Sequence, residues 1–314
     1  MNYTALIDGD IVVYRCGFAA EHTFYVVFDM AGDPDVPVAR LSSAAELKEW
    51  KETNETDVAD WEGDEPRYKL EREKEIEPLS HALSNVKSVM RGIMESTRCT
   101  KHKVYLSKGK CFRDAIATMK EYKGNRKNAP KPWHYDDIRK YLIEHYGAVE
   151  YSSIEADDAL ALAMNDHTIL CSIDKDLLQV PGHHYNWVLN QKILITPDVG
   201  KKKLALQAIT GDSTDNIPGV KGIGPVLARR ALADVEDYEA ASLYLWEEYL
   251  KASAEFELTE DGWSYTAWDG TNCVRTTKEI YDEVYQLVRV GGDDAINALQ
   301  QAGEELPNCE GTQG

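Results

Sequence analysis

The sequence predicts an α/β protein in which short buried strands alternate with helices. Apolar, β-prone runs at residues 3–7, 102–106, 148–151 and 168–173 are separated by segments with the apolar spacing of helices. Acidic residues follow the first and the last of these runs, and the ends of parallel strands are where α/β proteins place their functional sites. The length of 314 residues and the hydrophobic content of 43% suit one large globular domain or two.

Charge is unevenly distributed along the chain. The net charge of −19 would argue against a nucleic-acid partner if it were evenly spread. Residues 98–140, however, hold thirteen Lys or Arg against four Asp or Glu, interleaved with the aromatic residues Phe112, Tyr122, Trp133 and Tyr135. Cations neutralise phosphates and rings stack on exposed bases, so this segment indicates nucleic-acid binding. An ordinary basic surface is the alternative interpretation.

The sequence does not favour a membrane-spanning, secreted or zinc-binding protein. No apolar run approaches the ~18 residues of a membrane span, and the N-terminus meets an acid at Asp8 without the basic region of a signal peptide. The six cysteines form no CxxC pair, which argues against a zinc site. We therefore expect reduced thiols, a cytoplasmic location and no membrane partner.

The N-terminal part predicts a strand, a helix and an insertion. The first strand ends in Asp8-Gly9-Asp10, and a helix follows over 11–18; the alternative role for Asp8 is only to cap that helix. Residues 23–29 and 36–41 predict a hairpin. Residues 42–77 hold thirteen acids against six basic residues, so we expect a solvated, partly mobile insertion.

The middle of the chain contains the densest group of acids. A helix is expected over 78–96, a loop over 120–127 (KEYKGNRK) and a helix over 134–145. Five carboxylates then flank an alanine-rich helix and the strand at 168–173: Glu155, Asp157, Asp158, Asp174 and Asp176. Brought together, they would repel each other unless a cation shared them, so we hypothesise a divalent-metal site. A helix cap and two solvated turns are the alternative.

A glycine-rich turn follows a strand pair at 185–189 and 192–195 and a helix over 198–209. Asp212 and Asp215 are three residues apart, so one turn can present both. Three glycines and a lysine then precede a helix near Pro225: Gly219, Lys221, Gly222 and Gly224. Free backbone N–H groups at such a turn bind phosphate without reading bases, as in a helix–hairpin–helix element. The alternative is a tight turn between helices. Helices are expected over 238–251 and 278–290, around a less regular patch at 259–272.

The order of these motifs resembles the 5′-nuclease family of flap endonucleases and 5′→3′ exonucleases, and most closely its bacteriophage members. The matching pieces lie between residue 1 and about 235: LIDGD at 6–10, EYKGNR at 121–126, EADD at 155–158, IDKD at 173–176 and GDSTDNIPGVKGIGP at 211–225. The resemblance implies a central, mainly parallel sheet flanked by helices (a PIN/FEN-like nuclease fold), with a helix–hairpin–helix type DNA-binding arm. The nuclease domain would span 1–197, the helical DNA-binding region 198–303, and a flexible tail 304–314.

The resemblance also implies a set of site residues. Two Mg²⁺ ions, with Mn²⁺ as a substitute, would be held by Asp8, Glu155, Asp157, Asp158, Asp174, Asp176, Asp212 and Asp215. Of these, Asp8, Asp157, Asp158 and Asp174 are expected nearest the ions. Lys123 and Arg126 would stabilise the scissile phosphate, and Tyr122 would stack on terminal bases. DNA would also contact Arg113 and the glycine turn at Gly219, Lys221, Gly222 and Gly224, where some relatives bind K⁺.

The implied activity is metal-dependent hydrolysis of DNA phosphodiesters to 5′-phosphate products, by a 5′→3′ exonuclease or 5′-flap endonuclease. The substrate would be double-stranded DNA with a 5′ end or flap, with RNA–DNA hybrids open as substrates, in phage replication or primer removal in the host cytoplasm. One departure is that Ser107 or Lys108 stands where relatives carry a further metal-linked acid, and Asp114 is no obvious substitute. The rival functions are a DNA-binding member with weakened catalysis, a PIN-type ribonuclease, which lacks the glycine turn, and a metal phosphatase.

Overall fold

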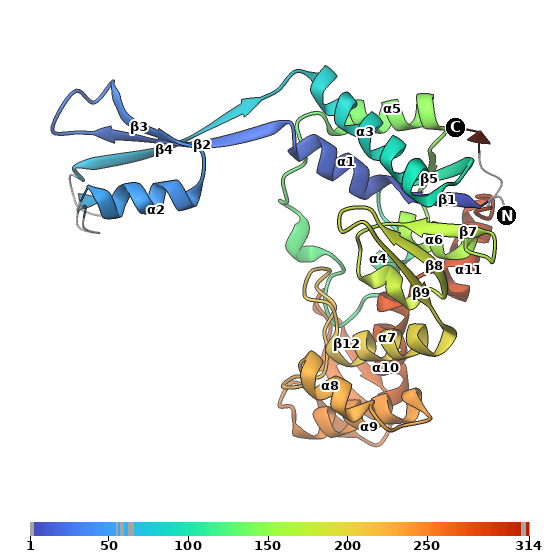
Figure 1. Ribbon diagram of the computed structural model, residues 1–314. Coiled ribbons are helices and arrows are strands. Elements are labelled where there is room, and N and C mark those ends of the chain that lie inside the picture. The colour runs from blue at the N-terminus through green and yellow to red at the C-terminus, as the bar shows by residue number, and fades with distance from the viewer. Residues whose placement is uncertain (1–2, 55, 57–59, 62–65, 309–311, 314) are drawn as a thin grey trace. The chain divides into compact units, whose positions relative to one another are not determined.

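The computed structural model describes residues 3–54, 56, 60–61, 66–308 and 312–313 (Figure 1). These residues form two compact units that interleave along the sequence. The larger unit comprises Met1–Val12, Val89–Pro130 and Arg139–Gly314, and the smaller comprises Val13–Ser88 and Lys131–Ile138. The boundary expected near residue 198 does not separate these units, because the segments on both sides of it belong to the larger one.

The larger unit is built on a mainly parallel sheet, as the sequence predicts. Its strand order is β13-β5-β1-β7-β8-β9, and β6 also pairs with β5. The five parallel strands are β1 (Thr4–Asp8), β5 (Lys101–Ser107), β6 (Val149–Tyr151), β7 (Thr168–Cys171) and β8 (Gly182–Asn186). The antiparallel strands are β9 (Gln191–Ile195) and β13 (Thr312–Gln313). The hairpin of β8 and β9 begins three residues before the expected position.

The carboxyl ends of the parallel strands meet at one edge of this sheet. Every residue of β1 is buried, and Asp8 lies beside Tyr105 of β5 while Ile7 lies beside Cys171 of β7. Helix α1 (Gly9–Phe18) leaves directly from this edge. Gly9 makes that departure possible, because a Cβ there would lie 2.5 Å from the Tyr105 carbonyl oxygen. The register therefore brings the ends of β1, β5 and β7 together.

Two helices of the larger unit close the core next to the sheet. Helix α6 (Ala156–Ala163) packs on β1 and β5, and its alanines allow the close approach. Helix α11 (Asp293–Ala302), which is not among the predicted helices, adds Ala295 and Leu299 to the same buried cluster. The buried residues of β1, β5, α6 and α11 thus form one core beneath the edge where the acids gather.

A second core of the larger unit forms around the fully buried Trp246. Its helices are α4 (Phe112–Ile116), α7 (Pro197–Thr210), α8 (Pro225–Ala231), α9 (Tyr238–Ala252) and α10 (Thr277–Val288). The region is not purely helical as expected, because 257–275 forms a three-stranded antiparallel sheet of β10 (Glu257–Thr259), β11 (Gly262–Thr266) and β12 (Asn272–Arg275). Trp263 and Tyr265 of β11 are both buried, a period-2 signal that the sequence analysis missed.

The smaller unit corrects the prediction for residues 42–77. Helix α2 (Ala44–Thr53) and strand β4 (Tyr68–Ile76) occur there, and β4 pairs with β2 (Glu21–Asp29), which also pairs with β3 (Pro37–Leu41). The acids of β4 did not prevent a strand because Arg40 of β3 pairs with Glu73 at 3.1 Å and with Glu75 at 2.5 Å. Residues 55, 57–59 and 62–65 lie outside the described part.

Helices α3 (Leu79–Thr97) and α5 (Tyr135–Tyr146) match their predicted positions.

The described residues of the C-terminal tail form hydrogen bonds with the larger unit. Glu304 accepts hydrogen bonds from the side-chain and backbone groups of Ser152 and Ser153, and the Tyr105 hydroxyl donates to the Asn308 carbonyl at 2.7 Å. Residues 312–313 pair with β5. The described residues of the tail therefore contact the larger unit, and its flexibility stays a prediction.

Candidate functional site

Four carboxylates from three parts of the chain lie close enough to interact at the edge where β1 and β7 end. Asp8 ends β1, Asp157 lies in the first turn of α6, Asp174 follows β7 and Asp176 begins η3 (Asp176–Gln179). Burial, followed by repulsion from Asp10, raises the pKa of Asp8 to about 7. Burial, followed by Asp8 and Asp174, holds the pKa of Asp157 well above its usual range. Burial and Asp174 raise the pKa of Asp176 to about 6.

Ser172, which belongs to none of the sequence motifs, organises these acids. The Ser172 hydroxyl donates to Asp8 Oδ2 at 2.7 Å and accepts from the Asp174 N–H at 3.0 Å. The Asp176 N–H donates to Asp174 Oδ1 at 2.7 Å, and the Ile11 N–H donates to Asp8 Oδ1 at 3.1 Å. Ser172 therefore links the end of β1 to the loop after β7, so that the two segments hold their carboxylates in fixed relation.

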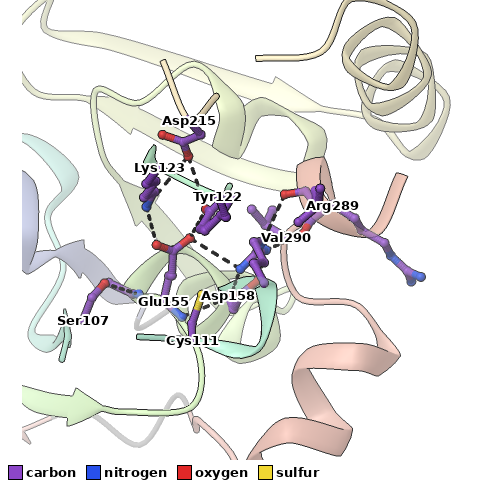
Figure 2. Close-up of polar contacts among 12 residues, drawn as sticks. Ser107, Cys111, Tyr122, Lys123, Glu155, Asp158, Asp215, Arg289 and Val290 are labelled. Carbon is purple, nitrogen blue, oxygen red and sulfur yellow. Dashed lines mark hydrogen bonds and ion pairs between the residues drawn. The ribbon is translucent and has the colours of Figure 1, made fainter. Parts of the chain in front are cut away.

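Glu155 is in a different environment, because basic and hydroxyl groups contact its carboxylate directly (Figure 2). Its carboxylate accepts from the Tyr122 hydroxyl at 2.7 Å, forms an ion pair with Lys123 and lies 3.4 Å from Arg113 Nη1. Burial alone would raise the pKa of Glu155, but Lys123 and Arg113 outweigh it, so the pKa is lowered. Glu155 is thus an ionised acid between the group of Asp8, Asp157, Asp174 and Asp176, here called the acidic cluster, and the loop at 120–127 that contains Lys123 and Arg126.

Asp158 serves as an internal anchor. Its side chain is 0% exposed, and both of its oxygens accept hydrogen bonds from Arg113 at 2.7 Å. The backbone N–H groups of Glu155 and Gly291 also donate to it, at 3.1 and 3.0 Å. This arrangement differs from the expectation that Asp158 lies among the residues nearest the ions, because its acceptor positions are already used within the protein.

Two residues expected to contact DNA are buried instead. Arg113 is 2% exposed and, besides Asp158, donates to the carbonyl oxygens of Leu287 and Arg289 at 3.0 and 2.6 Å. The prediction that Arg113 binds DNA is wrong, because the guanidinium is enclosed by these acceptors. Tyr122 is 6% exposed and packs in the second core, with its hydroxyl on Glu155 and 3.3 Å from Asp215. Its ring cannot stack on a base in this structure, so that expectation is also wrong here.

The KGNR loop and the segment that begins the glycine turn are joined by hydrogen bonds. The loop contains η2 (Gly124–Arg126), and Lys123 has a positive φ of 53°. Its N–H donates to the Asp215 carbonyl at 2.8 Å, and Arg126 Nε donates to the Thr214 carbonyl at 2.8 Å. Arg126 Nη2 also lies 2.5 Å from Asp215 Oδ1, and Lys123 Nζ lies 3.8 Å from Asp215 Oδ2. Two motifs about 90 residues apart thus form one structure in which Lys123 and Arg126 border the acids.

Asp212 connects the same segment to the acidic cluster. Its backbone exchanges two hydrogen bonds with Ile217, at 3.0 and 2.7 Å, and its Oδ1 accepts from the Thr214 N–H at 2.7 Å. Its side chain interacts with that of Asp176, which contributes to the raised pKa of Asp176. Asp212 therefore lies beside Asp176, while Asp215 lies beside Lys123 and Glu155. All eight predicted acids belong to one neighbourhood, in unequal roles.

Asp10 supplies a carboxylate next to the position where the expected acid is missing. The Ser107 N–H donates to Asp10 Oδ2 at 3.0 Å, and Arg139 Nη1 donates to Asp10 Oδ1 at 3.1 Å. Burial is the main cause of the raised pKa values of Asp8 and Asp10. Repulsion from Asp10 raises the pKa of Asp8 further, and repulsion from Glu155 raises that of Asp10. Asp10 therefore lies near both acids. The second Asp of LIDGD was the available signal.

The residues at and near Ser107 do not supply the acid that is expected there. Lys108 forms an ion pair with Glu150 at 3.2 Å. The Ser107 hydroxyl accepts from the Ala156 N–H at 2.8 Å, at the start of α6. Asp114 accepts from the Cys111 N–H at 2.9 Å as part of the cap of α4. The structure thus agrees that Asp114 is not a substitute.

The glycines of the turn between α7 and α8 divide into two kinds. Gly211 has a φ of 64°, and a Cβ on Gly219 would lie 2.2 Å from the Thr210 carbonyl, so these two glycines allow close backbone packing. A Cβ on Gly222 or Gly224 would instead meet nothing within 4 Å. The side chain of Lys221, which directly precedes Gly222, is 78% exposed. This end of the turn is open to a ligand.

The donor chemistry suits an oxygen-seeking divalent cation. The cluster of Asp8, Asp157, Asp174 and Asp176 offers carboxylate oxygens, and burial, followed by repulsion between neighbouring acids, raises the pKa values of Asp8, Asp157 and Asp176. Among the residues that the structure describes, no three His, Cys, Asp or Glu side chains form a ready ligand group for one ion. Carboxylate oxygens are ligands that hard divalent cations accept, so the residue types present are compatible with a divalent cation. No described helix is long and apolar enough to cross a membrane.

Comparison with known proteins places this geometry in context. No family model matches the chain. It is 31% identical to flap endonuclease Xni of Shewanella piezotolerans over 126 residues, which is 35% of this chain and 49% of that protein. It is 34% identical to the 5′-3′ exonuclease of Buchnera aphidicola over 140 residues, which is 38% of this chain and 48% of that protein. The matches therefore span about half the length of these curated relatives.

Solved structures extend the likeness to the whole fold. The T5 5′-exonuclease, solved as a mutant, aligns with a TM-score of 0.50 and 15% identity, covering 97% of this chain and 94% of that one. A bacteriophage T5 flap endonuclease complex with DNA and metal ions aligns with a TM-score of 0.50 and 19% identity, covering 71% and 86%. The resemblance to the 5′-nuclease family is confirmed: over about a third of its length the chain is a homologue of proteins named flap endonuclease and 5′-3′ exonuclease, and it has the fold of the T5 5′-exonuclease.

Proposed function

We propose that this protein is a divalent-metal-dependent 5′→3′ exonuclease and structure-specific 5′-flap endonuclease that hydrolyses DNA phosphodiesters to 5′-phosphate products. The observation that carries the proposal is the convergence of Asp8, Asp157, Asp174 and Asp176 at one sheet edge, with raised pKa values for Asp8, Asp157 and Asp176. Lys123 and Arg126 border this group through Glu155 and Asp215. Phosphodiester hydrolysis needs acids that hold metal ions and, next to them, positively charged side chains that stabilise the transition state.

In this proposal the four central acids hold two Mg²⁺ ions, for which Mn²⁺ substitutes. Asp10 and Asp212, with partners of their own, support the central acids from either side. Bound ions would supply a hydroxide nucleophile and stabilise the leaving oxygen. Ser172 keeps Asp8 and the Asp174 loop in register, so that the acids need little rearrangement when ions arrive.

The basic residues stabilise the phosphate rather than the metal. Lys123 and Arg126 are held by backbone bonds of their loop and by the carboxylates of Glu155 and Asp215. These carboxylates keep the cations in place before substrate arrives. A phosphate entering the site would share them, and their positive charge would act where negative charge grows during cleavage. Arg113 acts indirectly, by fixing Asp158 and Glu155 at the start of α6.

The proposed substrate is double-stranded DNA with a free 5′ end or a 5′ flap. The open glycines Gly222 and Gly224 with Lys221 suit the phosphate backbone of the duplex, in the manner of a helix–hairpin–helix element, with K⁺ a candidate ion at the same turn. RNA–DNA hybrids are a further candidate substrate. Removal of primers or flaps during phage DNA replication is the process that such an activity would serve.

A cleavage assay on 5′-labelled substrates tests the proposal. Blunt duplex, 5′-flap duplex and RNA–DNA hybrid are incubated with Mg²⁺, Mn²⁺ or chelator, and the product ends are mapped. We expect cleavage with either metal, none in chelator, and 5′-phosphate products. Binding of these substrates without cleavage would favour the DNA-binding alternative, and cleavage confined to single-stranded RNA would favour a PIN-type ribonuclease.

A further inference from the structure

We propose that Glu283 of α10 is a positioning residue for Lys123 and Arg126, the two cations of the KGNR loop; this rests on the proposed function. Its carboxylate holds the segment 117–119, which directly precedes the loop at 120–127. Trp268 and Tyr265 of the C-terminal region hold the same segment. We call Glu283, Trp268 and Tyr265 the loop clamp.

The carboxylate of Glu283 is buried and accepts hydrogen bonds on both oxygens. Its Oε1 accepts from the backbone N–H groups of Thr118 at 2.7 Å and Met119 at 3.0 Å. Its Oε2 accepts from the Thr118 hydroxyl at 2.5 Å and from Arg275 Nη1 at 2.6 Å. Thr118 lies 165 residues before Glu283, so these bonds join two distant parts of the chain.

The two rings of the loop clamp bind the same segment through other groups. Trp268, in the turn between β11 and β12, donates from Nε1 to the Ala117 carbonyl at 3.0 Å and from its backbone N–H to the Thr118 carbonyl at 3.1 Å. Because the Thr118 hydroxyl donates its one proton to Glu283, it accepts from the Tyr265 hydroxyl, 2.9 Å away. Backbone donors and acceptors of the segment are therefore both held from the C-terminal region.

The other side of the loop is held by the segment that begins the glycine turn. Asn216 Nδ2 donates to the Glu121 carbonyl at 2.9 Å, and the Lys123 N–H donates to the Asp215 carbonyl at 2.8 Å. In the proposed function the loop cations share their charge with an incoming phosphate. The backbone beneath them then has to be held by contacts that the substrate does not replace, and the loop clamp supplies such contacts.

Stability alone does not explain an acid at this position of α10. Ile280, Val284 and Leu287 of the same helix are buried in the second core. Burying a carboxylate costs free energy that its partners must offset, and an apolar residue of similar volume often serves stability as well or better. Glu283 instead binds a segment that leads to the proposed site, so placement of the loop accounts for the acid.

Hydrogen exchange tests the loop clamp without catalysis. Glu283→Gln leaves one acceptor oxygen where the carboxylate has two, and it removes the charge opposite Arg275. In chelator, residue-resolved exchange should be about 10-fold faster in this variant at Lys123 and Arg126 as well as at Thr118, because the loop loses one of its two fixed sides. Faster exchange confined to Thr118, or no change at all, would overturn the proposal.

Single-turnover cleavage shows whether the loop clamp acts through the cations. Glu283→Gln should slow cleavage in Mg²⁺ by about 10- to 100-fold, the effect of a small misplacement of a reacting group, with DNA and Mn²⁺ affinities within about 3-fold. In a Lys123→Ala background the same change should cost at most about 3-fold more, because residues that act as a unit are not additive. Additive losses would assign Glu283 a general structural role and contradict the proposal.

A second variant and two controls complete the test. Thr118→Val removes only a hydroxyl from the clamped segment, so it serves if Glu283→Gln does not fold, and it should show the same pattern at about 3-fold. Glu279→Gln, at the exposed start of α10, and Thr97→Val, which removes a hydroxyl bonded within α3, should change neither exchange nor cleavage. Equal effects in Glu279→Gln would assign the result to α10 as a whole and overturn the proposal.

The two functional claims fail in different ways. Failure of the proposed nuclease function would appear as absence of cleavage by the unaltered protein in Mg²⁺, while hydrogen exchange would still decide whether Glu283 holds the loop. Failure of the loop clamp alone would appear as normal cleavage by Glu283→Gln with unchanged exchange at Lys123 and Arg126.

Discussion

The carboxylate of Asp10 accepts a hydrogen bond from the backbone N–H of Ser107 at 3.0 Å, so that an acid from the start of α1 lies at the tip of β5. Related nucleases are expected to carry an acid of their own near this tip, and here Ser107 and Lys108 occupy the positions. Arg139 keeps Asp10 in place through a 3.1 Å bond. The chain thus has a carboxylate near this point from a different element.

Asp10→Asn should weaken metal binding as well as cleavage. Because Asp10 lies beside Asp8 and Glu155, loss of its charge should lower Mn²⁺ affinity by about 10- to 100-fold, the usual effect of a supporting partner. Calorimetric titration with Mn²⁺ measures this without turnover. Asp114→Asn is the matched control, because Asp114 only caps α4. Equal metal affinity in Asp10→Asn and the unaltered protein would remove Asp10 from the site.

Asp157→Ala should abolish cleavage while leaving DNA affinity within a few-fold. Asp157 lies in the first turn of α6, and its raised pKa reflects burial and the nearby Asp8 and Asp174. We expect a loss on the order of 10²- to 10³-fold or more in the cleavage rate with Mg²⁺. Asp136→Ala, in the first turn of α5, is the control acid. Unchanged cleavage by Asp157→Ala would reject the metal-site hypothesis.

Asp8→Asn should stabilise the metal-free protein, and more so at high pH. The folded-state pKa of Asp8 is about 7 against an ordinary value of 3.8, so folding favours the protonated form. The ionised Asp8 carboxylate destabilises the folded state. This destabilisation is absent below pH ~4, grows between pH ~4 and ~7 and is complete above that range. Each tenfold change in the proton affinity of the carboxylate corresponds to roughly 1.4 kcal/mol in the free energy of unfolding. Calorimetric melting in chelator should show a higher Tm for Asp8→Asn at pH 8 and little change at pH 4. A gain independent of pH would contradict this explanation.

Arg113→Met should destabilise the fold without altering DNA contacts. It would leave the fully buried Asp158 without its charge partner, which typically costs about 3–5 kcal/mol in the free energy of unfolding. Urea denaturation measures this loss. In the folded variant the salt dependence of DNA binding should be unchanged, because the guanidinium is enclosed. Lys110→Met, at an exposed position before α4, is the control. A reduced salt slope in Arg113→Met would restore Arg113 as a DNA contact.

Lys221→Glu should weaken duplex binding regardless of sequence. Its side chain is exposed beside the open glycines Gly222 and Gly224, where a phosphate backbone can approach. Loss of one phosphate contact should reduce the salt slope by about one unit. Affinities for two unrelated duplexes across a salt series provide the measurement, with Lys251→Glu as the control. Constant affinity and slope would reject the phosphate-binding role of the turn.

Local patterns in the sequence were sufficient for much of the architecture. The buried run of β1, the amphipathic spacing of α3 and α10, and the acids after β1 and β7 were all legible, because strand and helix periodicity depend on residues close along the chain. The motifs also indicated the family. Even β4 and β11 have strand signals in hindsight, although cross-strand pairing with β2 and β12 is what stabilises them.

Only the tertiary structure distinguished residues of the same type from one another. Arg113 and Arg126 are both basic residues of the segment at 98–140. Arg113 is buried against Asp158, which also accepts a hydrogen bond from the Gly291 N–H. Arg126 instead pairs with Asp215, beside the other acids of the site. Asp10 and Asp114 are both acids at helix starts, yet only Asp10 approaches Asp8. Charge and spacing are properties of the chain, whereas burial and partners arise from contacts between segments that are distant in the sequence, by 45 residues for Arg113 and Asp158 and by 133 for Asp158 and Gly291. That is why the sequence determined which residue types form the site, and the fold decided which of them can face a metal or a phosphate.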